Sequence, residues 1–129
     1  MIIARKDCLQ YSERDILGRS IRPTKDTLSI SPSGHFYIHY DTTGNAAPNL
    51  KDDDENSIPD YIDFVGSIAD SAHYLLIEVL GFQEEPYDGE GGYDIYIMSY
   101  GAGSYGFNYL DSGGSSYLQI DNDSANART

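Results

Sequence analysis

The feature that most constrains this chain is a carboxylate-rich segment that runs directly into a segment with helical periodicity. Residues 52–63 contain five Asp and one Glu. Pro59 suits the first turn of a helix, and Gly81 is a typical C-terminal cap. Between them, apolar side chains recur at three- and four-residue spacing: Ile62, Val65, Ile68, Ala69, Ala72, Leu75, Leu76 and Val79. This pattern predicts a helix over roughly 59–80 with one strong apolar face.

Apolar and polar residues alternate on both sides of this helix, which predicts strands. His35–Tyr40 places Phe36, Ile38 and Tyr40 on one face and His35, Tyr37 and His39 on the other. Further strands are predicted at 93–99, 105–110 and 117–121. Short connections between the last three favour an antiparallel meander. We therefore expect an α+β fold: one long helix packed on an antiparallel sheet of about four strands, in the order β-α-β-β-β.

The length of 129 residues fits a single domain. Residues 1–30 form a poorly specified N-terminal lead-in, and residues 31–129 are predicted to form the α+β lobe. Cys8 is the only cysteine, so no internal disulfide is expected. No apolar stretch reaches the length of a membrane span, and no signal peptide is visible at the start of the chain.

Charge is distributed unevenly along the chain, whose formal net charge is −13. Between Asp52 and Ala127 there are sixteen Asp or Glu and no Lys or Arg. Such a stretch repels phosphate groups, so a nucleic-acid partner is disfavoured. It also repels itself unless cations neutralise it. For the acidic residues outside 52–63, a solvated acidic surface is an equally good explanation.

Residues 52–63 fit a twelve-position calcium loop of the EF-hand type. Calcium is a hard cation that takes six to eight oxygen ligands, and oxygens recur at positions 1, 3, 5, 9 and 12 of this segment. Position 7 would offer its backbone carbonyl and direct an apolar side chain into the core. The candidate calcium ligands are therefore Asp52, Asp54, Asn56, Ile58 (carbonyl), Asp60 and Asp63.

Two positions depart from the usual loop. Position 6 is Ser57, where glycine is common because the turn needs a positive φ. Position 12 is Asp63, one methylene shorter than the usual Glu. The alternative interpretation is an acidic helix start, in which the aspartates cap the helix and suit its dipole. Because segment 43–51 lacks helical periodicity, a full helix-loop-helix EF-hand is not expected.

Other metal ligands are less well supported by spacing. His35 and His39 lie in a predicted strand, where a separation of four residues is roughly 13 Å, too far for one ion. His73 lies within the predicted helix and is expected to be structural. Asp121 and Asp123 could hold a second ion, although a turn after a strand explains them as well. No Ser-His-Asp or Cys-His arrangement follows from the spacing.

From about Ser31 onward the chain resembles a group of bacterial secreted zinc metalloproteases, over about three quarters of its length. The resemblance rests on four stretches in the family's order: SPSGHFYIHYDTTG, DDDENSIPDYID, GGYDIYIMSYGAGSYGFNY and SYLQIDND. The loop alone is less specific, because thrombospondin type 3 repeats and dockerins share it. The resemblance implies a secreted protein with a zincin-like N-terminal lobe. It also implies that Tyr117–Asp121 is an edge strand, available to a peptide substrate or to another copy of the chain.

In that family the strand ending in an IDND-like sequence precedes a helix carrying HExxH, which binds zinc. No HExxH occurs in this chain, so only the calcium-loop residues carry over. We therefore expect the calcium-binding N-terminal portion of a metalloprotease-like protein, truncated before its catalytic helix. Such a portion would be inactive alone and would use zinc only in the full-length protein. The alternatives are a free-standing calcium-dependent extracellular binding module, and an acidic domain without a ligand.

Overall fold

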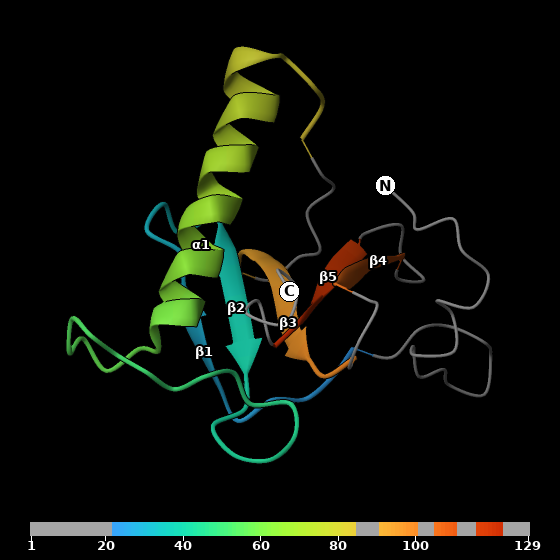
Figure 1. Cartoon of the computed structure of the whole chain (residues 1–129). Coiled ribbons are helices and arrows are strands. Elements are labelled where there is room, and N and C mark those ends of the chain that lie inside the picture. The colour runs from blue at the N-terminus through green and yellow to red at the C-terminus, as the bar shows by residue number, and fades with distance from the viewer. Residues whose placement is uncertain (1–21, 85–90, 101–104, 111–115, 123–129) are drawn as a thin grey trace.

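A computed structural model describes residues 22–84, 91–100, 105–110 and 116–122 (Figure 1). The elements are β1 (Thr27–Ile30), β2 (Phe36–Tyr40), α1 (Asp60–His73), β3 (Tyr93–Met98), β4 (Gly106–Leu110) and β5 (Ser116–Asp121), with the π-helix η2 (Tyr74–Val79) continuing α1. The predicted α+β class, with one helix on one sheet, is confirmed. The sheet has five strands, because the lead-in segment contributes β1.

The strand order is β1-β2-β3-β5-β4. Strands β2, β3 and β5 run parallel to one another, whereas β1 pairs antiparallel with β2 and β4 pairs antiparallel with β5. The expected all-antiparallel sheet is therefore wrong. The helix between β2 and β3 returns the chain to the same end of the sheet, which is what a parallel neighbour requires. Of the predicted meander, only the β4–β5 pairing is present.

Strand β5 is an inner strand, contrary to the edge position that the family resemblance implied. It pairs with β3 through Ile95↔Leu118 and with β4 through Tyr109↔Tyr117. Among the described strands, the edges are β1 and β4. The backbone groups of β5 are therefore engaged on both sides, and β5 cannot accept a peptide. Alternation reports which face of a strand is buried, but it carries no information about which strands lie beside it.

The main core lies between α1 and one face of the sheet. Its innermost side chains are Ile38, Ile62, Ile95 and Ile97, each at most 1% exposed. A second cluster, formed by Tyr96, Phe107, Tyr109 and Tyr117, covers the opposite face. Leu118 and Ile120 pack against the main core, whereas Tyr117 belongs to the second cluster. The alternation along β5 thus divides its side chains between the two faces of the sheet.

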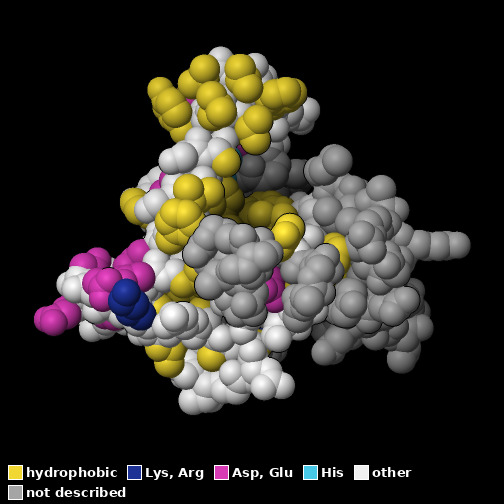
Figure 2. Space-filling view, viewed as in Figure 1, with side chains coloured by type: hydrophobic (Ala, Val, Ile, Leu, Met, Phe, Trp, Pro, Cys, Tyr) yellow, Lys and Arg dark blue, Asp and Glu magenta, His cyan; other side chains and the backbone are white. Residues whose placement is uncertain are grey.

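Only the first half of the long helix rests on the sheet. Its buried residues are Ile62, Val65 and Gly66, and no residue of η2 is buried. Beyond them the helix projects past the sheet (Figure 1), and hydrophobic side chains gather on its far end (Figure 2). The predicted apolar face is therefore longer than the surface that covers it. Gly81, with φ of +77°, follows the end of the helix, as predicted. Within the described residues, no helix is long and apolar enough to span a membrane.

A carboxylate ties α1 to the turn between β1 and β2. Asp70 accepts hydrogen bonds from Ser31 Oγ (2.8 Å), Ser33 N (2.8 Å) and Ser33 Oγ (2.6 Å). Burial favours the neutral acid, but the hydrogen bonds from Ser33 and Ser31, together with the nearby His35, outweigh it and lower the pKa of Asp70. The ionised form of Asp70 therefore stabilises the docking of the helix.

The uneven burial of α1 predicts two different outcomes for one substitution. Ile62→Ala should lower the free energy of unfolding by about 2–5 kcal/mol, because it leaves a cavity in the main core. Ile68→Ala, on the same helix but 53% exposed, should change it by less than about 0.5 kcal/mol. Urea unfolding of both variants measures the difference. Equal losses would contradict the position of α1 on the sheet.

Asp70→Asn should lower the free energy of unfolding at neutral pH by about 1 kcal/mol, since Asp70 is partly exposed and its charge-assisted hydrogen bonds are partly screened. Because folding lowers the pKa of Asp70 below its unfolded value of about 3.9, this contribution is complete above that value. It is lost as pH falls through the folded pKa. Urea unfolding between about pH 6 and pH 2.5 should therefore show that the free energies of unfolding of the wild type and of Asp70→Asn become equal in acid. A pH-independent difference would contradict the assignment.

Candidate functional site

The carboxylate-rich segment forms the loop that leads into α1. Figure 2 shows Asp and Glu side chains gathered on this projection beside a basic side chain, and Lys51 Nζ lies 3.3 Å from Asp53 Oδ2. The two ends of the loop are joined by the backbone, because Asp60 N donates to Lys51 O at 2.7 Å. Ile58 packs against the main core, as was predicted for the side chain at position 7 of the calcium loop. The loop is thus closed at its base and anchored by one apolar side chain.

Three of the predicted ligands converge. Single carboxylate oxygens of Asp52, Asp54 and Asp60 all lie within 4.8 Å of one another. Calcium binds oxygens at 2.3–2.6 Å, so two ligands of one ion can be up to about 5 Å apart. These three oxygens therefore lie close enough together to contact a single calcium ion. Asp60 is also the first residue of α1, where the partial positive charge of a helix N-terminus favours carboxylates.

The other predicted ligands lie beside this group of three carboxylates. Asn56 Nδ2 donates to Asp63 Oδ2 at 2.8 Å, so positions 5 and 12 are in contact. Asn56 Oδ1 accepts the N–H of Ile58 at 2.9 Å. Asp63 is not one of the three convergent carboxylates. For Asn56 and Asp63 to serve as ligands, an ion would have to replace the hydrogen bond between them.

The backbone of the loop has the conformation that a calcium loop needs at position 6. Ser57 has φ of +73°, and Glu55 has φ of +55°. These turns direct backbone N–H groups towards Asp52: Ser57 N donates to Oδ2 at 2.8 Å, and Asn56 N to Oδ1 at 3.3 Å. The expectation of a positive φ at Ser57, made from the motif alone, is confirmed.

Hydrogen bonds shift the pKa values of two loop carboxyls in opposite directions. Partial burial disfavours ionisation of Asp52, but hydrogen bonds from the Asp54 side chain and from three backbone N–H groups outweigh it, and its pKa is lowered. The pKa of Asp54 is raised, mainly by its side-chain hydrogen bond with Asp52 and also by burial and by the charges of Asp52 and Asp63. Ionisation of Asp54 is thus opposed by its neighbours, and a bound cation would offset that opposition.

His35 and His39 lie on different sides of the sheet, whereas the sequence predicted that they share one face. His39, expected to share a face with His35, contacts Asp94 Oδ1 through Nε2 at 2.7 Å and stacks on Tyr96. His35 precedes β2 and turns towards the helix, where its ring centroid lies 3.9 Å from that of His73. The predicted shared face is therefore wrong, because the strand alternation begins only at Phe36.

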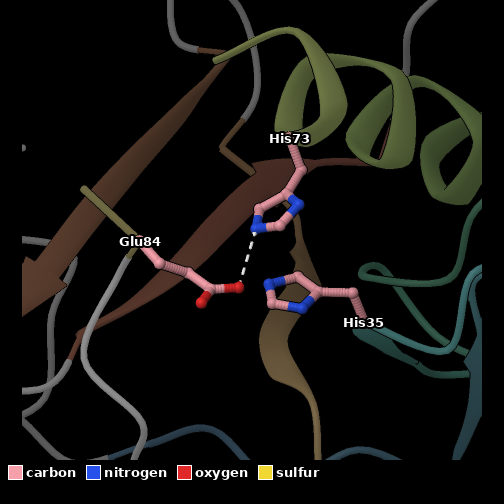
Figure 3. A group of neighbouring side chains, drawn as sticks. All are labelled: His35, His73 and Glu84. Carbon is pink, nitrogen blue, oxygen red and sulfur yellow. Dashed lines mark ion pairs between the residues drawn. The ribbon is translucent and has the colours of Figure 1, made fainter. Parts of the chain in front are cut away.

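A second group of possible metal ligands includes His35, His73 and Glu84, with one donor atom of each within 4.8 Å of the others (Figure 3). Sequence reasoning missed this group and assigned His73 a structural role. The three residues come from distant parts of the chain with no recognisable spacing. Only the docking of α1 on the sheet brings His73 to His35, so no local pattern could have revealed the cluster.

The suggested second ion site near the C-terminus is only partly described. Asp121 is buried, and its Oδ1 accepts the N–H of Tyr100 at 2.9 Å. Its carbonyl accepts the hydroxyl of Tyr61 at 2.6 Å. Asp121 thus links α1 to β5. Asp123 lies outside the described residues.

No protein-family model matches the chain, and neither the curated proteins nor the solved structures contain a significant match.

The positive φ of Ser57 predicts that Ser57→Gly stabilises the protein by roughly 0.5–1 kcal/mol, because glycine adopts this conformation without strain. Calcium affinity should change little, because the metal-free loop already has this conformation. Ser67→Gly is the matched control. Ser67 is exposed on α1, where glycine should destabilise by about 0.5–1 kcal/mol. Thermal unfolding and calcium titration of both variants test this. Destabilisation by both substitutions would contradict the assigned backbone conformation.

Proposed function

We propose that residues 52–63 bind one calcium ion and that this ion stabilises the attachment of α1 to the sheet. The observation that supports this most is the convergence of the Asp52, Asp54 and Asp60 carboxylates beside a backbone turn of positive φ at Ser57. Asp60 belongs to α1, whereas Asp52 and Asp54 belong to the loop. An ion held by all three would link the loop to the first turn of the helix.

The chemistry of these donors favours calcium over other common cations. All of them are oxygens, which hard cations prefer, whereas zinc and copper prefer imidazole and thiolate. Magnesium requires near-ideal octahedral geometry and keeps several waters, whereas calcium accepts irregular sets of six to eight oxygens. In the proposed site, Asn56, the Ile58 carbonyl and Asp63 complete the coordination. The charge of the ion would offset the repulsion among the carboxylates.

We further propose that this lobe belongs to a secreted, metalloprotease-like protein. The support is the sequence resemblance over four ordered stretches. Peptide pairing, if the longer protein performs it, would fall to an edge strand. Strand β4 is the described edge beside β5, and it pairs antiparallel with β5. In this proposal the zinc chemistry belongs to residues beyond this sequence.

The alternative function is a free-standing calcium-dependent extracellular binding module, which would use the same loop. The two proposals differ in what the gene encodes after Thr129. An in-frame HExxH within a few tens of codons would support the metalloprotease-like protein. A stop codon there, with calcium-dependent binding to a cell surface or its polymers, would support the module.

If the loop binds calcium only in the folded state, calcium should raise the melting temperature. At a free concentration 100 times the dissociation constant, the gain is about 2.7 kcal/mol, or roughly 10 °C for a domain of this size. Differential scanning calorimetry in EDTA and in millimolar calcium measures the shift. The same melting temperature in both solutions would refute the proposal.

Two substitutions that each remove one negative charge separate ligation from general electrostatics. Asp54→Asn should abolish most of the calcium-dependent shift, because Asp54 is one of the three convergent carboxylates. Asp53→Asn should preserve it, because the Asp53 side chain is 71% exposed and contacts Lys51. Equal loss in both variants would show that calcium screens the acidic surface without occupying the loop.

A further inference from the structure

His35, His73 and Glu84 meet at one end of α1, away from the carboxylate loop. His73 is the last residue of α1, and His35 immediately precedes β2. Glu84 follows the turn at Gly81, whose φ of +77° ends the helix. In Figure 3 the two imidazole rings and the carboxylate point towards a common space between them. The geometry points to a zinc site formed by these three side chains, with a coordination position open to water.

The distances in the cluster match a tetrahedral zinc centre. His73 Nε2 lies 3.5 Å from Glu84 Oε2. Bonds of about 2.0–2.1 Å at tetrahedral angles place two ligand atoms about 3.4 Å apart. The third donor atom, from His35, completes a group in which every separation is within 4.8 Å. The His73–Glu84 separation is therefore already that of two ligands of one zinc ion, and His35 lies close enough to supply the third.

Convergence of the three donors on one ion requires a side-chain rotation. The two rings are inclined at 31° with centroids 3.9 Å apart, so their lone pairs do not yet converge on one point. Rotation about the Cβ–Cγ bond of histidine is soft and has no sharp minima. The backbone at His35 is already fixed: its N–H donates to Ser33 Oγ at 3.1 Å, and its carbonyl accepts Tyr93 N at 2.7 Å.

The cluster is bordered by an apolar ring on one side and is open to solvent on the other. Phe36 meets both rings edge-on, at 4.7 Å from His35 and 5.8 Å from His73. The His73 side chain is 18% exposed, whereas that of Glu84 is 58% exposed. A metal ion can therefore enter from the side of Glu84. Asp70 also interacts electrostatically with His35 and adds negative charge near the cluster.

The donor set selects zinc over calcium. Two imidazole nitrogens suit zinc, copper, iron and nickel, whereas calcium takes oxygen ligands. Two histidines and one carboxylate also hold iron(II), but in a facial arrangement with further open positions. The 3.5 Å separation of His73 Nε2 and Glu84 Oε2 fits the tetrahedral set of two histidines, one glutamate and one water that zinc uses. The competing explanation is a metal-free contact, in which a protonated imidazole pairs with the Glu84 carboxylate. The two explanations differ in whether zinc binds and in which residues its binding requires.

The test is a titration of the whole chain with zinc, and with cobalt as a spectroscopic substitute, in saturating calcium. Calcium occupies the proposed carboxylate loop, so the remaining zinc binding reports on the histidines. We expect one zinc per chain and the visible absorption bands of tetrahedral cobalt. His35→Gln and His73→Gln should each weaken binding by about 100-fold or more, because even the outer-shell partners of a metal contribute 10–100-fold. Glu84→Gln should also weaken it.

His39→Gln is the matched control, because His39 contacts Asp94 and lies outside the cluster. It should bind zinc like the wild type, and so should Asp54→Asn, which damages the calcium loop. Circular dichroism without metal checks that each variant folds. If His35→Gln or His73→Gln unfolds, long-range ¹H–¹⁵N spectra of the wild type identify the ligands by the shifts of ring nitrogens. Absence of zinc binding, or zinc shifts confined to His39, would overturn the proposal.

Discussion

The packing of the first half of α1 on the sheet is the contact on which the rest of the structure depends. Ile62 and Val65 enter a core whose sheet residues include Ile38 and Ile97, and Gly66 is also buried there. This contact sets the position of α1, whose first residue is Asp60 and whose last is His73. Each of the two clusters of candidate metal ligands thus contains one end of α1, so the same hydrophobic contact positions both.

The sequence predicted local features well and long-range ones poorly, for a physical reason. Helix spacing, the cap at Gly81 and the positive φ at Ser57 follow from interactions within a few residues, and the structure contains all three. Strand order depends on backbone hydrogen bonds that any sequence can make, so the inner position of β5 was not predictable. Three of the six predicted calcium ligands converge. The His35–His73 contact depends on tertiary packing and left no trace in the sequence pattern.

Charge balance is one reason for proposing that this fold binds cations. Each Lys or Arg in the described part of the chain lies against an aspartate: Arg22 with Asp94, Lys25 with Asp41 and Lys51 with Asp53. The Arg22 guanidinium also lies over the Tyr117 ring at 4.8 Å, which attaches the residues before β1 to the second aromatic cluster. No further Lys or Arg follows until Arg128. Among the described residues, Lys51 is thus the basic side chain that lies against the loop carboxylates, and a bound cation would add to its charge.

The end of the long helix shows where such ions would have the largest effect. Contacts between α1 and the sheet extend to His73, which meets His35. Beyond it, Leu75, Val79, Leu80 and Phe82 are each at least half exposed. Among the described residues, segment 82–84 is held to the helix by the Phe82 N–H on the Leu76 carbonyl and by the Glu84 contact with His73. These are weak attachments, because a partly exposed ion pair contributes at most about 1 kcal/mol. A zinc ion shared by His35, His73 and Glu84 would join this segment to both the helix and the sheet. Zinc would therefore stabilise the part of the fold that hydrophobic packing leaves least supported.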